Sequence, residues 1–122
     1  MTLSIEALNS KLTSTSTDPS VITQINFEDV MAVISANYHY QPSTFTNGET
    51  VNQAGTNEGS CKIFAYAQLN GLSEQPTLHC FGQYYRDDVL KNPSGNDHGN
   101  IRNFMKSGWA GITFENNALI AK

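Results

Sequence analysis

The sequence has little cysteine and no long hydrophobic segment. Its two cysteines, Cys61 and Cys80, do not form a disulfide framework, and the chain does not begin with a cationic stretch followed by an apolar one. We therefore expect reduced thiols and a cytoplasmic protein. No uninterrupted apolar run approaches the roughly 18 residues that a membrane-spanning helix needs, so we expect no membrane partner.

Basic residues are also scarce. Eleven acidic residues face seven basic ones, which gives a formal net charge of −4. The chain has no run of Lys and Arg that would overcome the repulsion from nucleic-acid phosphates. We therefore expect no nucleic-acid partner.

What is present fits one folded domain. The chain has 122 residues, close to the commonest size of a single domain. Hydrophobic residues make up 39% of it and include six Phe, five Tyr and one Trp, enough for a packed core. We expect a single domain spanning residues 1–122.

Apolar residues recurring every three or four positions predict about five helices. They lie over residues 4–12, 27–37, 61–69, 77–89 and about 97–108. Asn26, Thr77 and Asp97 are the expected N-caps, because short polar side chains can accept hydrogen bonds from the first free N–H groups of a helix.

Two hairpins are expected beside these helices. Residues 44–51 form the first, with Asn47-Gly48 suited to a type I′ turn. Residues 112–114 and 118–120 form the second, with a turn at Asn116-Asn117. The fold class is therefore α+β, with a small antiparallel sheet built from two hairpins.

Polar residues concentrate between positions 84 and 103, which hold both arginines of the chain. Two helices joined by a short Pro/Gly loop usually pack antiparallel, which would bring Arg86 or Asp88 near His98 and Arg102. Arginine suits carboxylate or phosphate, so we predict an anion-binding site. The alternative is structural: an Asp88–Arg102 salt bridge, with Asp97 only capping a helix.

The candidate binding surface contains further residues of the polar segments and of a loop before the third helix. These residues are Tyr85, Asn100, Asn57 and Glu58. A loop that leads into a helix offers free backbone N–H groups to an anion. Capping of the helix by Asn57 is the alternative.

Catalytic chemistry is a second possibility. Cys61 lies near the start of a helix, where a thiol becomes a better nucleophile, and His98 could serve as its base. Against this, Cys61 shares a helical face with Phe64, where a free cysteine packs as a small hydrophobic residue. The three histidines show no metal-ligand spacing, so we expect neither a metal site nor a cofactor.

Three blocks of sequence carry a family resemblance. They are AGTNEGSCKIFAYA at 54–67, FGQYYRDDVL at 81–90 and the segment 97–112, with its NIRNFM motif. Together they resemble the HopJ type III effector family from about residue 45 onward. The resemblance implies delivery by type III secretion into a host cell, where a host protein could be the partner, but it implies no settled activity. Nine Ser or Thr among the first twenty residues are compatible with an export signal.

Three functions follow as expectations. The first is an effector-like binding protein that holds an anionic group of a partner or a small molecule. The second is a small hydrolase or transferase that uses His98 with Cys61 or with a bound substrate. The third is a bacterial housekeeping protein with no host role.

Overall fold

The structure, a computed structural model, describes residues 4–14 and 25–122. The helices are α1 (Ile5–Thr13), α2 (Phe27–Asn37), α3 (Glu58–Leu69), α4 (Glu74–His79), the π-helix η3 (Tyr84–Val89), α5 (Gly99–Ser107) and the 3-10 helix η4 (Gly108–Gly111). The strands are β1 (Tyr38–Tyr40), β2 (Phe45–Asn47), β3 (Thr50–Asn52), β4 (Ile112–Phe114) and β5 (Leu119–Ala121). This arrangement confirms the predicted α+β class.

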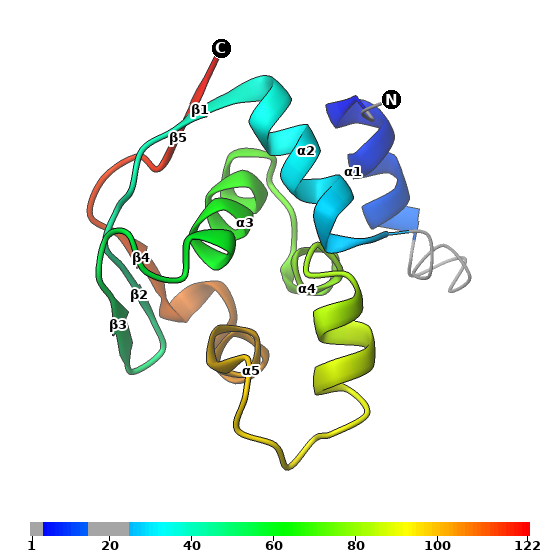
Figure 1. The fold of residues 1–122 in the computed structure, drawn as a ribbon, viewed down its shortest axis with the longest axis vertical. Helices are drawn as coiled ribbons and strands as arrows, with labels where there is room; N and C mark the ends of the chain where they lie inside the picture. Colours follow the sequence, from blue (N-terminus) through cyan, green and yellow to red (C-terminus); the bar gives the residue numbers. More distant parts are fainter. Residues whose placement is uncertain (1–3, 15–24) are drawn as a thin grey trace.

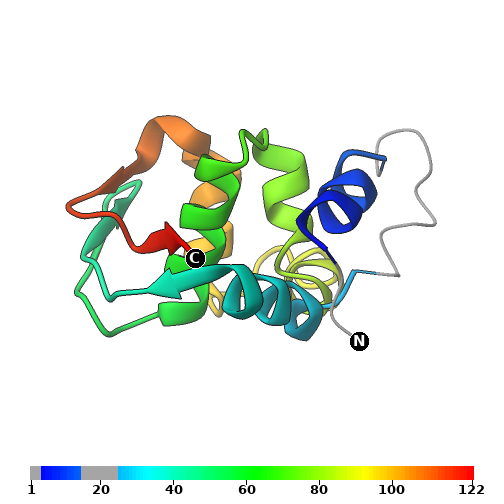
Figure 2. The same cartoon turned by 90° about the horizontal axis from the view of Figure 1, so that it is seen from above.

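Helix α3 is the centre of the fold. It lies in the middle of the molecule, with the strands at one end and α1 and α4 toward the other (Figures 1 and 2). Residues on every side of it are buried, including Ile63, Phe64 and Tyr66, each 0% exposed. Burial around its whole circumference explains its low amphipathicity, because a helix covered on all sides needs no polar face.

The first predicted hairpin is confirmed, with a shifted turn. Strands β2 and β3 pair with Asn47 opposite Thr50, so the two loop residues are Gly48 and Glu49. Of these two, only Gly48 has a positive φ, +63°. The predicted type I′ turn at Asn47-Gly48 is therefore wrong, because that turn needs positive φ at both central residues.

The second predicted hairpin does not form. Strand β4 pairs with β2, and strand β5 pairs with β1, both antiparallel. The register continues across the gap between the two ladders: Tyr40 lies opposite Leu119, and Phe45 opposite Phe114. The segments 38–47 and 112–121 thus form one interrupted antiparallel ribbon, and this long-range pairing replaces the local one.

The helix predicted over 77–89 is two helices. Helix α4 begins at Glu74 after the N-cap Ser73, so Thr77 is not a cap but lies within the helix. The chain turns at Gly82, where φ is +58° and an added Cβ would lie 2.4 Å from the backbone nitrogen of Phe27. Only glycine allows α2 to approach so closely here. The chain then continues as η3.

The prediction of helix 27–37 is confirmed, since α2 spans Phe27–Asn37. Asn26 is its N-cap residue, but its side chain caps nothing; Gln83 Oε1 accepts from the Phe27 N–H instead. No helix among the described residues is long and apolar enough to cross a bilayer.

Candidate functional site

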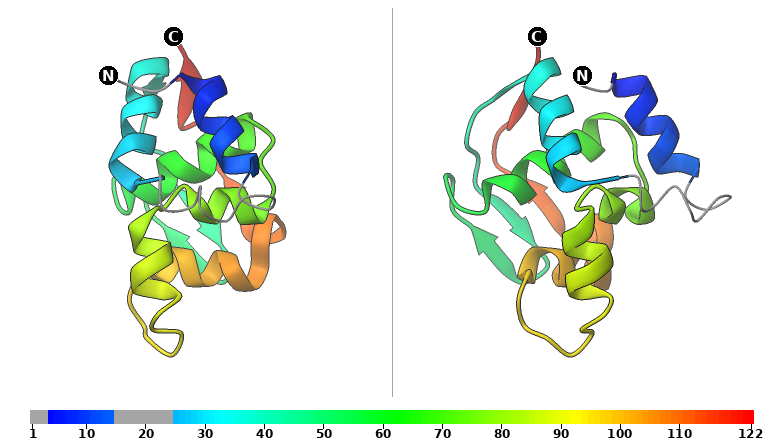
Figure 3. Two further views of the ribbon diagram at one scale, coloured as in Figure 1. Left: turned by 90° about the vertical axis from the view of Figure 1, so that its right-hand side faces the viewer. Right: turned by 45° about the vertical axis from the view of Figure 1, so that its right-hand side comes forward.

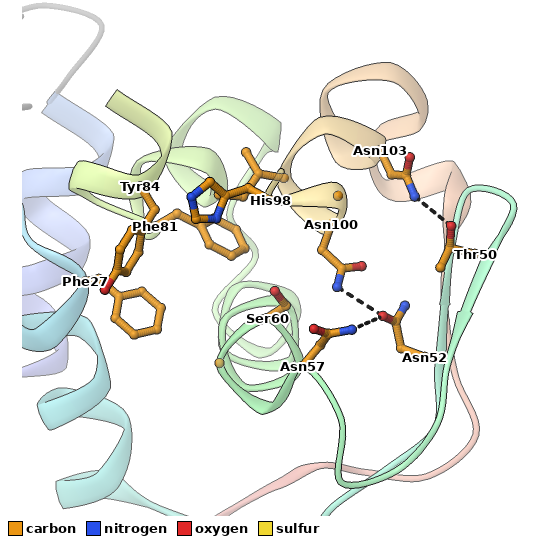
Figure 4. A pocket seen from close by; sticks show the side chains of 13 residues that line it. Phe27, Thr50, Asn52, Asn57, Ser60, Phe81, Tyr84, His98, Asn100 and Asn103 are labelled. Carbon is orange, nitrogen blue, oxygen red and sulfur yellow. Dashed lines mark hydrogen bonds between the residues drawn. The ribbon is translucent and has the colours of Figure 1, made fainter. Parts of the chain in front are cut away.

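A cavity of about 470 Å³ opens where α3 and α5 begin (Figure 4). Aromatic side chains form one wall and carboxamides the other, with Ser60 between them. The lining residues are Phe27, Thr50, Asn52, Asn57, Gly59, Ser60, Phe81, Tyr84, His98, Gly99, Asn100, Ile101 and Asn103. Among them there is no Lys, Arg, Asp or Glu, and His98 is the one histidine.

Two helix N-termini meet at this cavity. Asn57 is the N-cap of α3 and His98 the N-cap of α5, and neither helix has a side-chain cap. The first intrahelical bonds come from the Cys61 and Arg102 N–H groups, so the three preceding N–H groups of each helix have no partner within the helix. The cavity therefore receives the positive ends of two helix dipoles.

Both N-cap residues adopt an unusual backbone conformation. Asn57 has φ 50° and ψ 45°, and His98 has φ 49° and ψ 51°. Within the described part of the chain they are the non-glycine residues with positive φ. Such conformations cost free energy and cluster at functional sites. Because both lie on one cavity, we take this cavity as the candidate functional site.

A buried asparagine joins the two N-termini. The side-chain oxygen of Asn52, which is 3% exposed, accepts from Asn57 Nδ2 at 2.8 Å and from Asn100 Nδ2 at 3.0 Å. Asn47 Nδ2 in turn donates to the carbonyl and the side-chain oxygen of Asn100. The starts of α3 and α5 are thus held to the β2–β3 hairpin.

His98 is oriented by acidic neighbours. Its Nε2 lies 3.0 Å from Asp88 Oδ2 and 3.9 Å from Asp97 Oδ2. The ring also contacts Tyr84, with centroids 5.5 Å apart. Because Asp88 Oδ2 lies within hydrogen-bond distance of Nε2, Asp88 fixes the orientation of the ring. Asp88 and Tyr84 both belong to η3, and π-helical turns are frequent at functional sites.

Neither arginine lines the cavity with His98, although Arg102 and His98 both lie beside the Asp97 carboxylate. Arg102 binds the connection between η3 and α5, donating to the Asp97 carbonyl, Asp97 Oδ1 and the Asn92 carbonyl at 2.6, 2.6 and 3.0 Å. This connection projects from the molecule in Figures 1 and 3. Arg86 donates to the Ile25 carbonyl, and neither arginine lines the cavity. The predicted three-residue site of Arg86, Arg102 and His98 is not assembled.

The structural alternative is also corrected. Asp88 pairs with His98 and not with Arg102, although the predicted approach of Asp88 to His98 is confirmed. Asp97 does not cap α5, because its carboxylate accepts from Arg102. That hydrogen bond lowers the pKa of Asp97 below its usual value.

Cys61 lies away from the cavity. It is 1% exposed, and its thiol donates to the Ser43 carbonyl at 3.7 Å. Burial raises its pKa, which disfavours the thiolate. It does not line the cavity with His98, so the Cys61–His98 pair is not formed.

The remaining predicted residues divide between the cavity and its surroundings. Asn57 and Asn100 line it, whereas Tyr85 is buried and its hydroxyl accepts from Gln75. Glu58 lies near Tyr40. The pKa of Tyr40 is raised first by burial, then by Cys61 and then by the charge of Glu58. In the described ranges, no three His, Cys, Asp or Glu side chains are grouped to hold a metal ion.

Sequence reasoning missed several lining residues. These are Phe27, Thr50, Asn52, Gly59, Ser60, Phe81, Tyr84, Gly99, Ile101 and Asn103. The available signal was the number of asparagines in the two loops that precede α3 and α5, because asparagine tolerates positive φ.

Comparison with known proteins identifies the family. The model of the HopJ type III effector protein family matches residues 7–119. The chain belongs to the HopJ type III effector protein family. A crystal structure of VPA0580, a protein of unknown function, is similar over 100% of this chain and 97% of that one, with 50% identity and a TM-score of 0.91. No curated protein matches the chain.

Proposed function

We propose that this HopJ protein is a binding protein that holds the anionic group of a ligand in the cavity between α3 and α5. The observation that carries the proposal is the meeting of two uncapped helix N-termini with His98 on one cavity of about 470 Å³. Cavities of this size are typical of small-molecule sites.

The first turns of α3 and α5 supply hydrogen-bond donors at this end of the cavity. The backbone N–H groups of Gly59, Ser60, Gly99 and Asn100 belong to the first turns of the two helices, where an anion accepts hydrogen bonds and meets the helix dipoles. The Ser60 hydroxyl also lines the cavity. The proposal keeps an anion site, with main-chain donors and the doubly protonated ring of His98, whose second N–H can donate to the anion, in place of arginine.

The arrangement is fixed before a ligand arrives. Asn52 joins Asn57 to Asn100, and Asp88 fixes the ring of His98. A site whose donors are already oriented loses less conformational freedom on binding. The free energy stored in the two positive-φ residues is consistent with this preorganisation.

Titration with inorganic phosphate, followed by the amide resonances of the protein, tests the proposal. We expect the largest shifts at Gly59 and Gly99, and at least a fivefold weaker affinity in His98→Ala. His39→Ala is the matched control, because His39 is an exposed histidine on β1 outside the cavity. Shifts spread evenly over the surface, or equal losses in both variants, would contradict the proposal.

One observation favours a second function, a hydrolase or transferase. The Asp88–His98 pair resembles the orienting half of an acid–base system, in which a carboxylate fixes the tautomer of a histidine that faces a substrate. Such an enzyme uses His98 on a substrate bound in the cavity, without Cys61. Its test is hydrolysis of p-nitrophenyl acetate and p-nitrophenyl phosphate. Turnover that is lost in both His98→Ala and Asp88→Asn, but kept in Cys61→Ala, would support it.

The family description also motivates an effector role. We propose delivery by type III secretion, with the Ser/Thr-rich first twenty residues as the signal. Residues 1–3 and 15–20 of this region lie outside the described residues. Fusion of residues 1–20 to a translocation reporter tests the idea. Equal delivery by strains with and without a working secretion system would leave the housekeeping role.

A further inference from the structure

We infer that the ligand of this cavity carries an aromatic ring next to its anionic group. The inference rests on the proposed function, because it concerns the part of the ligand beyond the helix N-termini. It identifies the ligand class as a small aromatic acid, either a carboxylate or a phosphate.

The wall opposite the carboxamides is aromatic (Figure 4). Phe27 comes from α2, Tyr84 from η3, and Phe81 from the turn between α4 and η3. The rings of Phe27 and Tyr84 meet edge to face, with centroids 5.1 Å apart, and His98 continues the wall beside Tyr84. Phe81 is 2% exposed, whereas Phe27 and Tyr84 are only partly buried. These two rings leave apolar surface that a ligand ring can cover.

The aromatic wall adjoins the anion-binding end. An added Cβ at Gly59, the second residue of α3, would lie 2.9 Å from Cζ of Phe27. The Phe27 ring therefore lies directly against the helix N-terminus. A ring that stacks on this wall can carry its acidic group on the same ring or one bond away from it.

The charge and size of the cavity narrow the class further. The described lining residues include no Lys, Arg, Asp or Glu, and His98 is the one basic residue among them, so the cavity provides for one anionic group and an otherwise uncharged ligand body. Its volume of about 470 Å³ equals roughly 15 water molecules in the liquid. A ligand with one ring or two fused rings and one acidic group fits this space.

Three probes with the same anionic group test the inference: phenyl phosphate, cyclohexyl phosphate and inorganic phosphate. We expect phenyl phosphate to bind about tenfold more tightly than inorganic phosphate and about fivefold more tightly than cyclohexyl phosphate, because only the planar ring stacks face or edge on Tyr84. Resonances of Gly59 and Gly99 locate each probe.

Matched variants complete the experiment. Tyr84→Leu should remove the preference for the phenyl ring, and Tyr84→Phe should keep it. Phe114→Leu is the control, because Phe114 is a half-buried aromatic on β4 outside the cavity. Native-like amide spectra establish that each variant is folded.

The outcomes separate this inference from the proposed function. Equal affinity for the phenyl and cyclohexyl esters, or a preference that survives Tyr84→Leu, would overturn the aromatic class while anion binding stands. If inorganic phosphate and both esters all fail to bind at the cavity, the proposed function itself fails, and the inference falls with it.

Discussion

His98 contributes to the cavity through both its side chain and its backbone. Its side chain faces the cavity and pairs with Asp88, while its backbone begins α5 with φ 49°. Asn57 shares this conformation at the start of α3. The backbone conformations of these two N-cap residues cost folding free energy, and they place the first N–H groups of α3 and α5 beside the cavity.

The backbone strain at His98 is measurable by comparing two variants. His98→Gly and His98→Ala both remove the imidazole, but glycine adopts positive φ without a steric penalty. We expect His98→Gly to be the more stable by about 1 kcal/mol in the free energy of unfolding in urea. The reverse order is usual inside helices, so an alanine variant of equal or greater stability would contradict the strain.

We expect a second histidine, the buried His79, to make the free energy of unfolding depend on pH. His79 is 6% exposed, and burial, followed by the charge of Arg86, lowers its pKa below 6.5. As the pH falls below 6.5, His79 takes up a proton in the unfolded state before it does so in the folded state. The free energy of unfolding therefore decreases until the pH reaches the lowered pKa of the folded state.

We expect His79→Gln to flatten this part of the pH profile. Urea unfolding between pH 7.5 and 5 measures it, and His39→Gln, a change at an exposed histidine, should keep the wild-type slope. An identical slope in the wild type and His79→Gln would show that other groups cause it.

At the scale of elements, the connection between η3 and α5 positions His98. Arg102 holds this connection through the Asp97 and Asn92 carbonyls and the Asp97 carboxylate, and its side chain is 14% exposed. The connection lies on the outside of the molecule, so it is held by the hydrogen bonds of Arg102 and not by packing in the core.

Removing this arginine should loosen the segment. We expect Arg102→Ala to lower the free energy of unfolding by about 2 kcal/mol and to raise amide exchange over residues 92–98. Lys106→Ala, at an exposed position on the same helix, is the control and should change neither. Unchanged exchange in Arg102→Ala would mean that the connection is ordered without it.

The elements also show how far sequence reasoning reached. The boundaries of α2 and the pairing of β2 with β3 followed from apolar spacing and turn residues, which are local signals. The break at Gly82 and the pairing of β5 with β1 depend on contacts with distant segments, so local patterns did not reveal them. The approach of Asp88 to His98 was predicted from helix packing. The partners of the two arginines were not predicted, because they depend on which backbone carbonyls the loops place near each guanidinium group.

At the scale of the whole molecule, the ribbon of β1, β2, β4 and β5 joins distant parts of the chain. Leu119 on β5 is 3% exposed, while its neighbour Ile120 is 48% exposed. We expect Leu119→Ala to lower the free energy of unfolding by about 3 kcal/mol and Ile120→Ala to change it by less than about 0.5 kcal/mol. Chemical unfolding measures both. Similar small effects would mean that β5 contributes little to the fold.

Along the sequence, most residues that line the cavity lie between two strands of this ribbon, β2 and β4. Every lining residue except Phe27 lies between positions 47 and 112, the last residue of β2 and the first of β4. The cavity is therefore formed mainly by one long segment of the chain, and the two ends of this segment are joined by the pairing of β2 with β4. A ligand that binds this segment in its folded form also opposes the separation of β2 from β4. We therefore expect a ligand in the cavity to slow proteolytic cleavage at the carboxyl end of the chain, which follows β4 and β5.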